Sequence, residues 1–125
     1  MHELTQSFIF EAAHTLNRAY LADPAAVLGS KRIHGHSYRA LVTVRGIADP
    51  TTGMLLDLHT FRQQLHTVQS QLDHHLLDEV ADLGPATLEN LTQYIWRQLQ
   101  PTLASLYRVT VERVLTGDSC SYYGT

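Results

Sequence analysis

The sequence has almost no cysteine, no long apolar run and no strong excess of charge. Cys120 is the single cysteine in 125 residues, so a disulfide framework is excluded, and this fits a reducing compartment. No apolar run approaches the ~20 residues that cross a bilayer. The formal net charge is −3, and the first residues resemble no signal peptide. We therefore expect a cytoplasmic protein that binds neither membranes nor nucleic acids.

Histidine, in contrast, is frequent, with eight residues. His14 ends a run, 4–14, in which apolar and polar residues alternate, and His34 and His36 begin a second such run, 34–46. Successive side chains of a strand point to opposite faces, so His34 and His36 point the same way. If the two strands pair, the three imidazoles converge.

Three histidines around an open fourth position are typical of a catalytic zinc site, because a structural site needs a fourth protein ligand. A histidine near a strand end is also commonly a surface or capping residue, and a lone His-x-His pair is a weak signal. On spacing alone, both interpretations remain open.

The rest of the chain predicts one domain, 1–125, in the order β-β-α-α-β-β. We expect the two alternating runs to be strands, joined by a long loop over 15–33. A turn then precedes Asp57, which is a suitable N-cap. Apolar residues recur at helical spacing from 58 to 72 and predict an amphipathic helix.

The second half predicts another helix and two more strands. Thr87 is a suitable N-cap for a helix whose apolar stripe extends from 88 to 103. Residues 107–115 alternate as a strand, and 119–124 predict a short one. Two helices on one face of an antiparallel sheet form an α+β layer architecture. The other face would stay uncovered, which favours a homo-oligomer with sites between subunits.

Two further groups of residues suggest chemistry but also have simple structural explanations. Asp73 next to His74 places a carboxylate beside an imidazole, a pairing used for general acid–base work. A histidine at the end of a helix also stabilises the helix dipole, and without other context we prefer this explanation. Thr87 and Glu89 are fully explained as a cap and a favourable first-turn acid.

Six ordered motifs cover nearly the whole chain and are together specific. They resemble the 6-pyruvoyltetrahydropterin synthase and 6-carboxytetrahydropterin synthase family. The motifs are Phe-x-Ala-Ala-His at 10–14, His-Gly-His-Ser-Tyr at 34–38, Gly-Met-x-x-Asp at 53–57, Leu-Asp-His-x-x-Leu at 72–77, Thr-x-Glu-Asn at 87–90 and Tyr-x-Gly at 122–124.

The resemblance implies a fold and a metal. The tunnelling fold is a four-stranded antiparallel sheet with two helices on one face, which closes into a barrel by oligomerisation, usually as a hexamer. The metal implied is zinc, held by His14, His34 and His36. Zinc would act as a Lewis acid on side-chain oxygens of the substrate and acidify the neighbouring C–H.

The resemblance also implies an activity. Family members are lyases that take 7,8-dihydroneopterin triphosphate, shift protons on its side chain and eliminate triphosphate. The carboxy branch also cleaves the side chain on the way to the queuosine precursor. Asp73 and His74 would form the acid–base pair, and a neighbouring subunit is a candidate to contribute this pair to the site. Thr87 and Glu89 would help to hold the pterin ring.

The chain departs from the family at the catalytic cysteine. The family carries this cysteine four residues before the first histidine of His-Gly-His, and here that position is Ser30. A thiol titrates near 8.5, whereas a serine hydroxyl needs a partner base to lose its proton. Asp23 is the only carboxylate in the 15–33 segment, and Cys120 is distant in sequence. Ser30 is therefore a poor replacement base.

The second departure is at the pterin anchor. The family has a glutamate on the third strand, and Arg113 stands at that position here, after Glu112. A carboxylate accepts hydrogen bonds from the amino-pyrimidine edge, whereas a guanidinium can only donate. Arg113 instead suits a carboxylate or phosphate, which it can grip through two bonds. Glu112 would point to the other face unless a bulge shifts the register.

Three hypotheses follow. The first is a zinc-dependent lyase of this family that acts on dihydroneopterin triphosphate or a related anionic compound. The second is a retired or re-purposed homologue that binds zinc and a small anionic, non-pterin ligand. The third is a barrel in which zinc has only a structural role.

Overall fold

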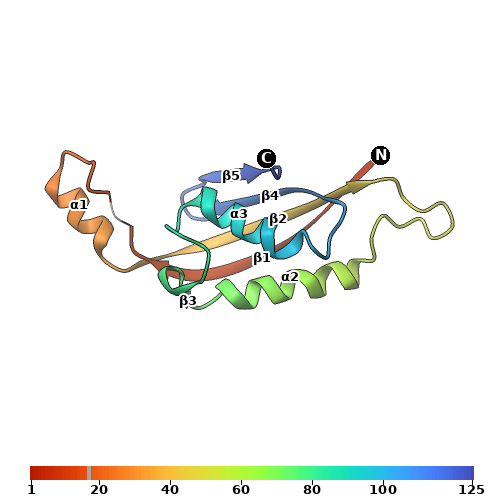
Figure 1. Cartoon of the computed structure of the whole chain (residues 1–125), viewed down its shortest axis with the longest axis horizontal. Helices are drawn as coiled ribbons and strands as arrows, with labels where there is room; N and C mark the ends of the chain where they lie inside the picture. The colour runs from red at the N-terminus through yellow and green to blue at the C-terminus, as the bar shows by residue number, and fades with distance from the viewer. Residues whose placement is uncertain (17) are drawn as a thin grey trace.

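The computed structural model describes residues 1–16 and 18–125, and its centre is a five-stranded mixed sheet (Figure 1). The strand order across the sheet is β3-β1-β2-β4-β5. All neighbouring pairs are antiparallel except β1 and β3, which are parallel. The strands are β1 (His2–His14), β2 (His34–Gly46), β3 (His75–Leu76), β4 (Leu106–Arg113) and β5 (Ser119–Tyr122).

Three α-helices and one 3-10 turn accompany the sheet. They are α1 (Pro24–Lys31), α2 (Leu58–Leu72), α3 (Leu88–Leu99) and η1 (Leu77–Glu79). Both predicted caps are present: Asp57 accepts from the backbone N–H of Thr60, and Thr87 accepts from that of Asn90. Each cap satisfies a donor that the first helical turn leaves free. None of the helices in the described ranges has the length and hydropathy to span a membrane.

The β1–β2 pair brings the histidine motifs together. The two strands pair in unbroken register from His2 opposite Gly46 to His14 opposite His34. The even-numbered residues of both strands from Phe8 onward face the core, as the alternation of polar and apolar residues predicted. The last pair of this ladder, His14 opposite His34, therefore brings two of the three histidines together.

Helices α2 and α3 cover the same face of the sheet, so the predicted layer architecture is confirmed in this respect (Figure 1). Helix α2 packs mainly on β1, and α3 packs on β4 and β5. Their apolar stripes meet the inward side chains of the strands in one core. The fully buried members include Phe10, Tyr38, Val42, Phe61, Leu72, Leu91, Ile95, Val109 and Val111.

Several expectations were wrong in detail. The 15–33 segment is not all loop: Asp23 caps α1, and Pro24 occupies the first helical turn, where its missing N–H costs nothing. Asn17, within the same segment, lies outside the described residues. Figure 1 shows α1 standing away from the sheet.

The sheet also differs from the four-stranded antiparallel one that we expected. Strand β3 adds a fifth, parallel strand, with His75 opposite Ala12. Helix α3 ends at Leu99, although Leu103 beyond it is still buried. The last two strands, β4 and β5, end at Arg113 and Tyr122, two residues before the expected ends.

Candidate metal centre and active site

Three histidines meet at the end of the β1–β2 pair. His14 faces His34 directly across the ladder, and His36 lies on the same face of β2. Their ring centroids are 4.4 to 5.2 Å apart. One ligand nitrogen from each ring lies within 4.8 Å of the others. The convergence that the sequence predicted is therefore present.

The hydrogen bonds of these rings leave the right nitrogens available. Nδ1 of His14 lies 3.2 Å from the backbone oxygen of Thr15, and Nδ1 of His34 lies 2.9 Å from that of Arg32. A carbonyl oxygen only accepts, so each Nδ1 carries the proton and each Nε2 keeps its lone pair. Nε2 of both His14 and His36 is buried without a hydrogen-bond partner. Such backbone contacts orient metal-binding histidines, and the donor set fits zinc.

The surroundings keep two of these imidazoles neutral. Burial lowers the pKa of His14, chiefly by removing water from its charged form. Burial, and then the nearby Arg113 guanidinium, lowers the pKa of His36 from 6.5 to about 4. Only a neutral imidazole can bind a metal, so both rings are ready to act as ligands at neutral pH.

A cavity of about 240 Å³ opens over the three histidines. Its wall includes Ser30, at the position of the family's cysteine. Ser30 is buried, and its hydroxyl donates to the backbone oxygen of Val27 at 2.7 Å. The same wall carries two guanidinium groups, those of Arg18 and Arg113.

The register of β4 settles which face Arg113 occupies. Arg113 is opposite Tyr38, and Glu112 is opposite Arg39; the only irregularity of this ladder lies between Thr43 and Val44. Arg113 therefore shares the inner face with the histidines. Glu112 lies on the outer face, where its carboxylate is 3.1 Å from Arg39.

Asp73 and His74 form a hydrogen-bonded pair at the edge of the sheet. Nδ1 of His74 lies 3.0 Å from Oδ2 of Asp73, while Oδ1 of Asp73 accepts from the backbone N–H of Glu11 at 2.8 Å. That backbone bond, followed by the contacts with His74, lowers the pKa of Asp73. His74 has a left-handed φ of 59°, and 81 % of its side chain is exposed.

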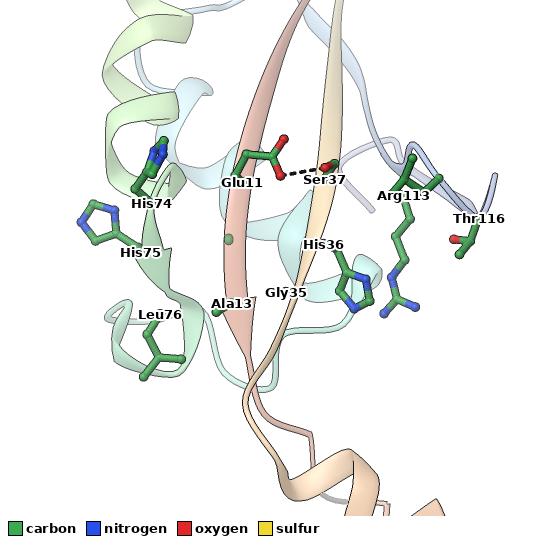
Figure 2. Close-up of a pocket in the computed structure, with 12 residues that line it drawn as sticks. Glu11, Ala13, Gly35, His36, Ser37, His74, His75, Leu76, Arg113 and Thr116 are labelled. Atoms are coloured by element: carbon green, nitrogen blue, oxygen red, sulfur yellow. Dashed lines mark hydrogen bonds between the residues drawn. The ribbon is translucent and has the colours of Figure 1, made fainter.

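A second, larger cavity of about 630 Å³ includes His74, and Figure 2 shows the residues that line it. His74 lies on the β1 side of the β1–β2 pair, and His36 lies beyond β2 with the Arg113 guanidinium beside it. His74 is hydrogen-bonded to β1 and His36 belongs to β2, so the two backbones are about 10 Å apart at ordinary strand spacing. His36 and His74 therefore line the same cavity from opposite sides of the β1–β2 pair.

Thr87 and Glu89 have only structural contacts in this chain. The Thr87 hydroxyl accepts from the Asn90 backbone N–H at 3.1 Å, and the Glu89 side chain is exposed. Neither residue is among those that line the two cavities.

Sequence reasoning missed Arg18 and Tyr38. Arg18 lies in the segment before α1, where no periodic pattern singles out a residue. Tyr38 is fully buried beside His36, and burial raises the pKa of its hydroxyl. Its place in the alternation of β2, two residues after His36, was the signal that could have identified it.

Comparisons with known proteins agree with this fold. The sequence model of the family described as 6-pyruvoyl tetrahydropterin synthase matches residues 3–125. The human 6-pyruvoyl tetrahydrobiopterin synthase is 33 % identical, and the match covers 87 % of this chain and 83 % of the human protein. The Drosophila melanogaster enzyme of the same name is 35 % identical over 86 % of this chain and 71 % of its own.

Solved structures show the same relationship. The Caenorhabditis elegans 6-pyruvoyl tetrahydropterin synthase superposes with a TM-score of 0.83 at 28 % identity, over 99 % of this chain and 96 % of its own. The Plasmodium vivax protein shares the fold at 20 % identity, with a TM-score of 0.71 over 98 % of both chains. On its sequence and its structure, this chain belongs to the 6-pyruvoyl tetrahydropterin synthase family.

Proposed function

We propose that this protein is a zinc-dependent lyase that acts on 7,8-dihydroneopterin triphosphate or a related anionic compound. The observation that carries the proposal is the convergence of His14, His34 and His36, with Nε2 of His14 and of His36 buried and unpartnered. Zinc bound there would polarise substrate oxygens and acidify the neighbouring C–H.

His74 is the proposed proton-transfer group. The Asp73 carboxylate accepts from Nδ1–H of His74, which leaves Nε2 to take a proton from substrate and return it. The low pKa of Asp73 keeps it ionised, so it stabilises the imidazolium that forms. Ser30 is not the proposed base, because its hydroxyl already donates to Val27.

We propose that the complete site forms between subunits. His74 and His36 line opposite sides of one cavity, and their backbone segments are about 10 Å apart at ordinary strand spacing, so His74 lies at the outer edge of that cavity. The exposed His74 of one subunit can reach the histidine cluster of a neighbour in a closed homo-oligomer, proposed here as a hexamer. Thr87 and Glu89 would contact substrate in the same assembly. The proposed location of the protein is the cytoplasm.

The test is product analysis. Zinc-loaded protein is incubated with 7,8-dihydroneopterin triphosphate, and the products are identified by mass spectrometry. A pyruvoyl or carboxy pterin supports the proposal, and the carboxy product would support a role in making the queuosine precursor. Unchanged substrate in the presence of stoichiometric zinc contradicts turnover of this compound.

A second function is favoured by Ser30 and Arg113. Both occupy positions where the family's usual chemistry calls for a different group. A re-purposed homologue would retain zinc and bind a small anionic ligand without turning over any pterin. It is distinguished from the lyase by a preparation that contains zinc and binds the anionic ligand but turns over no pterin.

A further inference from the structure

We infer that the cavity over the three histidines receives an oxyanion, a carboxylate or a phosphate, held between the guanidinium groups of Arg18 and Arg113. The inference rests on the proposed function and deepens it, because it names the chemical class of the group that the site receives. It also separates this protein from relatives that seat the amino-pyrimidine edge of a pterin at this position.

The two arginines have unsatisfied donors inside the site. Nε of Arg18 and Nε of Arg113 are both buried, and neither has a hydrogen-bond partner among the described residues. A buried donor without an acceptor is unfavourable, and more so when it is charged. Both side chains line the same cavity, so one acceptor group can satisfy both.

The charges around the cavity leave these arginines without an internal counter-ion. The described residues that line it include three histidines and two arginines but no carboxylate. Three acids at this end of the sheet have other partners. Glu11, which lines the larger cavity with Arg113, accepts from the Ser37 hydroxyl at 2.7 Å. Glu112 pairs with Arg39 on the outer face, and Asp78 accepts from the backbone N–H and hydroxyl of Thr15.

The backbone holds each arginine in place. Arg113 ends β4 in register with Tyr38, so its guanidinium lies beside His36 (Figure 2). The segment that carries Arg18 is tied to α1, because the Leu16 N–H donates to the Ser30 carbonyl at 2.7 Å. A guanidinium presents paired donors that match the oxygens of a carboxylate or phosphate. An amino-pyrimidine edge offers mainly donors at this point and would be repelled.

Calorimetric titration of the zinc-loaded protein tests the inference, with inorganic phosphate and glycolate as probes and neutral dihydroneopterin as the comparison. Arg113→Gln and Arg18→Gln are each expected to weaken binding of the preferred anion about tenfold or more, since a charge-assisted hydrogen bond is lost. Arg113→Lys retains the positive charge but lacks the paired donors of a guanidinium, so its anion affinity should lie between those of wild type and Arg113→Gln. Arg45→Gln is the control: Arg45 stacks on Tyr107 at the far end of β2.

Phosphate binding that depends on both arginines identifies a phosphorylated ligand, and glycolate binding with this dependence identifies a carboxylated one. Equal anion affinity in wild type and both glutamine variants overturns the inference, as does tight dihydroneopterin binding that Arg113→Gln does not change. Zinc content is measured in the same samples. Arginine-dependent anion binding without zinc would contradict the metal part of the proposed function and leave the inference intact.

Discussion

Arg113 lies directly opposite Tyr38 in the β2–β4 ladder, so its guanidinium shares the buried face with the histidine cluster. The one irregularity of this ladder, at Thr43 and Val44, lies too far along the strands to move Arg113 to the other face. A single substitution at this position therefore changes the charge of the site rather than of the outer surface.

Arg113→Glu is predicted to raise pterin affinity. A carboxylate here would accept hydrogen bonds from the amino-pyrimidine edge, and we expect about a tenfold gain for one charge-assisted contact. Fluorescence titration with dihydroneopterin measures it. Arg108→Glu makes the same charge change on β4 at a position outside both cavities and should leave the affinity unchanged. No gain in Arg113→Glu would show that the ring binds elsewhere.

Removal of one histidine is predicted to empty the metal site. His36→Ala deletes one of three ligands, so bound zinc should fall from about one per chain to well below that value. Elemental analysis after dialysis measures the content. His59→Ala removes an exposed histidine of α2 and is the matched control. Full zinc content in His36→Ala would show that the ion is held by other residues.

The convergence of the three histidines was predictable from the sequence, because strand alternation fixes which side chains share a face and needs no tertiary detail. His34 and His36 share a face whichever strand β2 pairs with. The apolar face of β1, which carries Phe10, had to be the buried one. Arg18 was not predictable in this way, since it lies outside any helix or strand, where no period assigns a side chain to a face. Helix α1 itself has only a weak apolar stripe, and the cap at Asp23 was its clearest signal.

The β3 edge of the sheet could not be predicted from the sequence either. Strand β3 has two residues, too few for a periodic pattern to appear. The backbone N–H of His74 donates to the Glu11 carbonyl and His75 pairs with Ala12, and these contacts place the strand beside β1. The Asp73–His74 pair could be identified as chemistry only through the family motif. Its place at the β3 edge of the sheet, with β1 between it and β2, required the sheet order.

The stability of the metal-free protein is predicted to fall as the solution becomes more acidic. The pKa of His36 is about 4 in the folded chain and 6.5 when unfolded, so the unfolded state binds more protons between these values. The free energy of unfolding should therefore decline from about pH 6.5 towards pH 4 and then lose this dependence. Thermal denaturation in chelator measures it.

His36→Gln should flatten that decline, because glutamine does not titrate. His59→Gln, at an exposed position on α2, should retain the wild-type slope. Identical slopes in His36→Gln and wild type would assign the acid sensitivity to other groups.

His74→Asn is predicted to abolish most turnover without unfolding the edge. Asparagine tolerates the left-handed φ of 59° that His74 adopts. Loss of the proton-transfer group should lower kcat by about 10²–10⁴, while zinc content stays at the wild-type level. Asp73→Asn should also lower kcat, and its Oδ1 can still accept from Glu11. Wild-type kcat in His74→Asn would remove this residue from the mechanism.

Activity is predicted to return when two inactive variants are assembled together. The His36→Ala chain lacks one of the three histidines but retains Asp73 and His74. The His74→Asn chain retains the three histidines but lacks the proton-transfer group. If each site combines the metal of one subunit with the His74 of another, random co-assembly restores about a quarter of the sites. Mixed oligomers are made by co-expression, and the separately purified variants, mixed after assembly, serve as the control. Because a site within one chain cannot be rescued, no recovery on co-expression would place His74 and its metal in the same subunit.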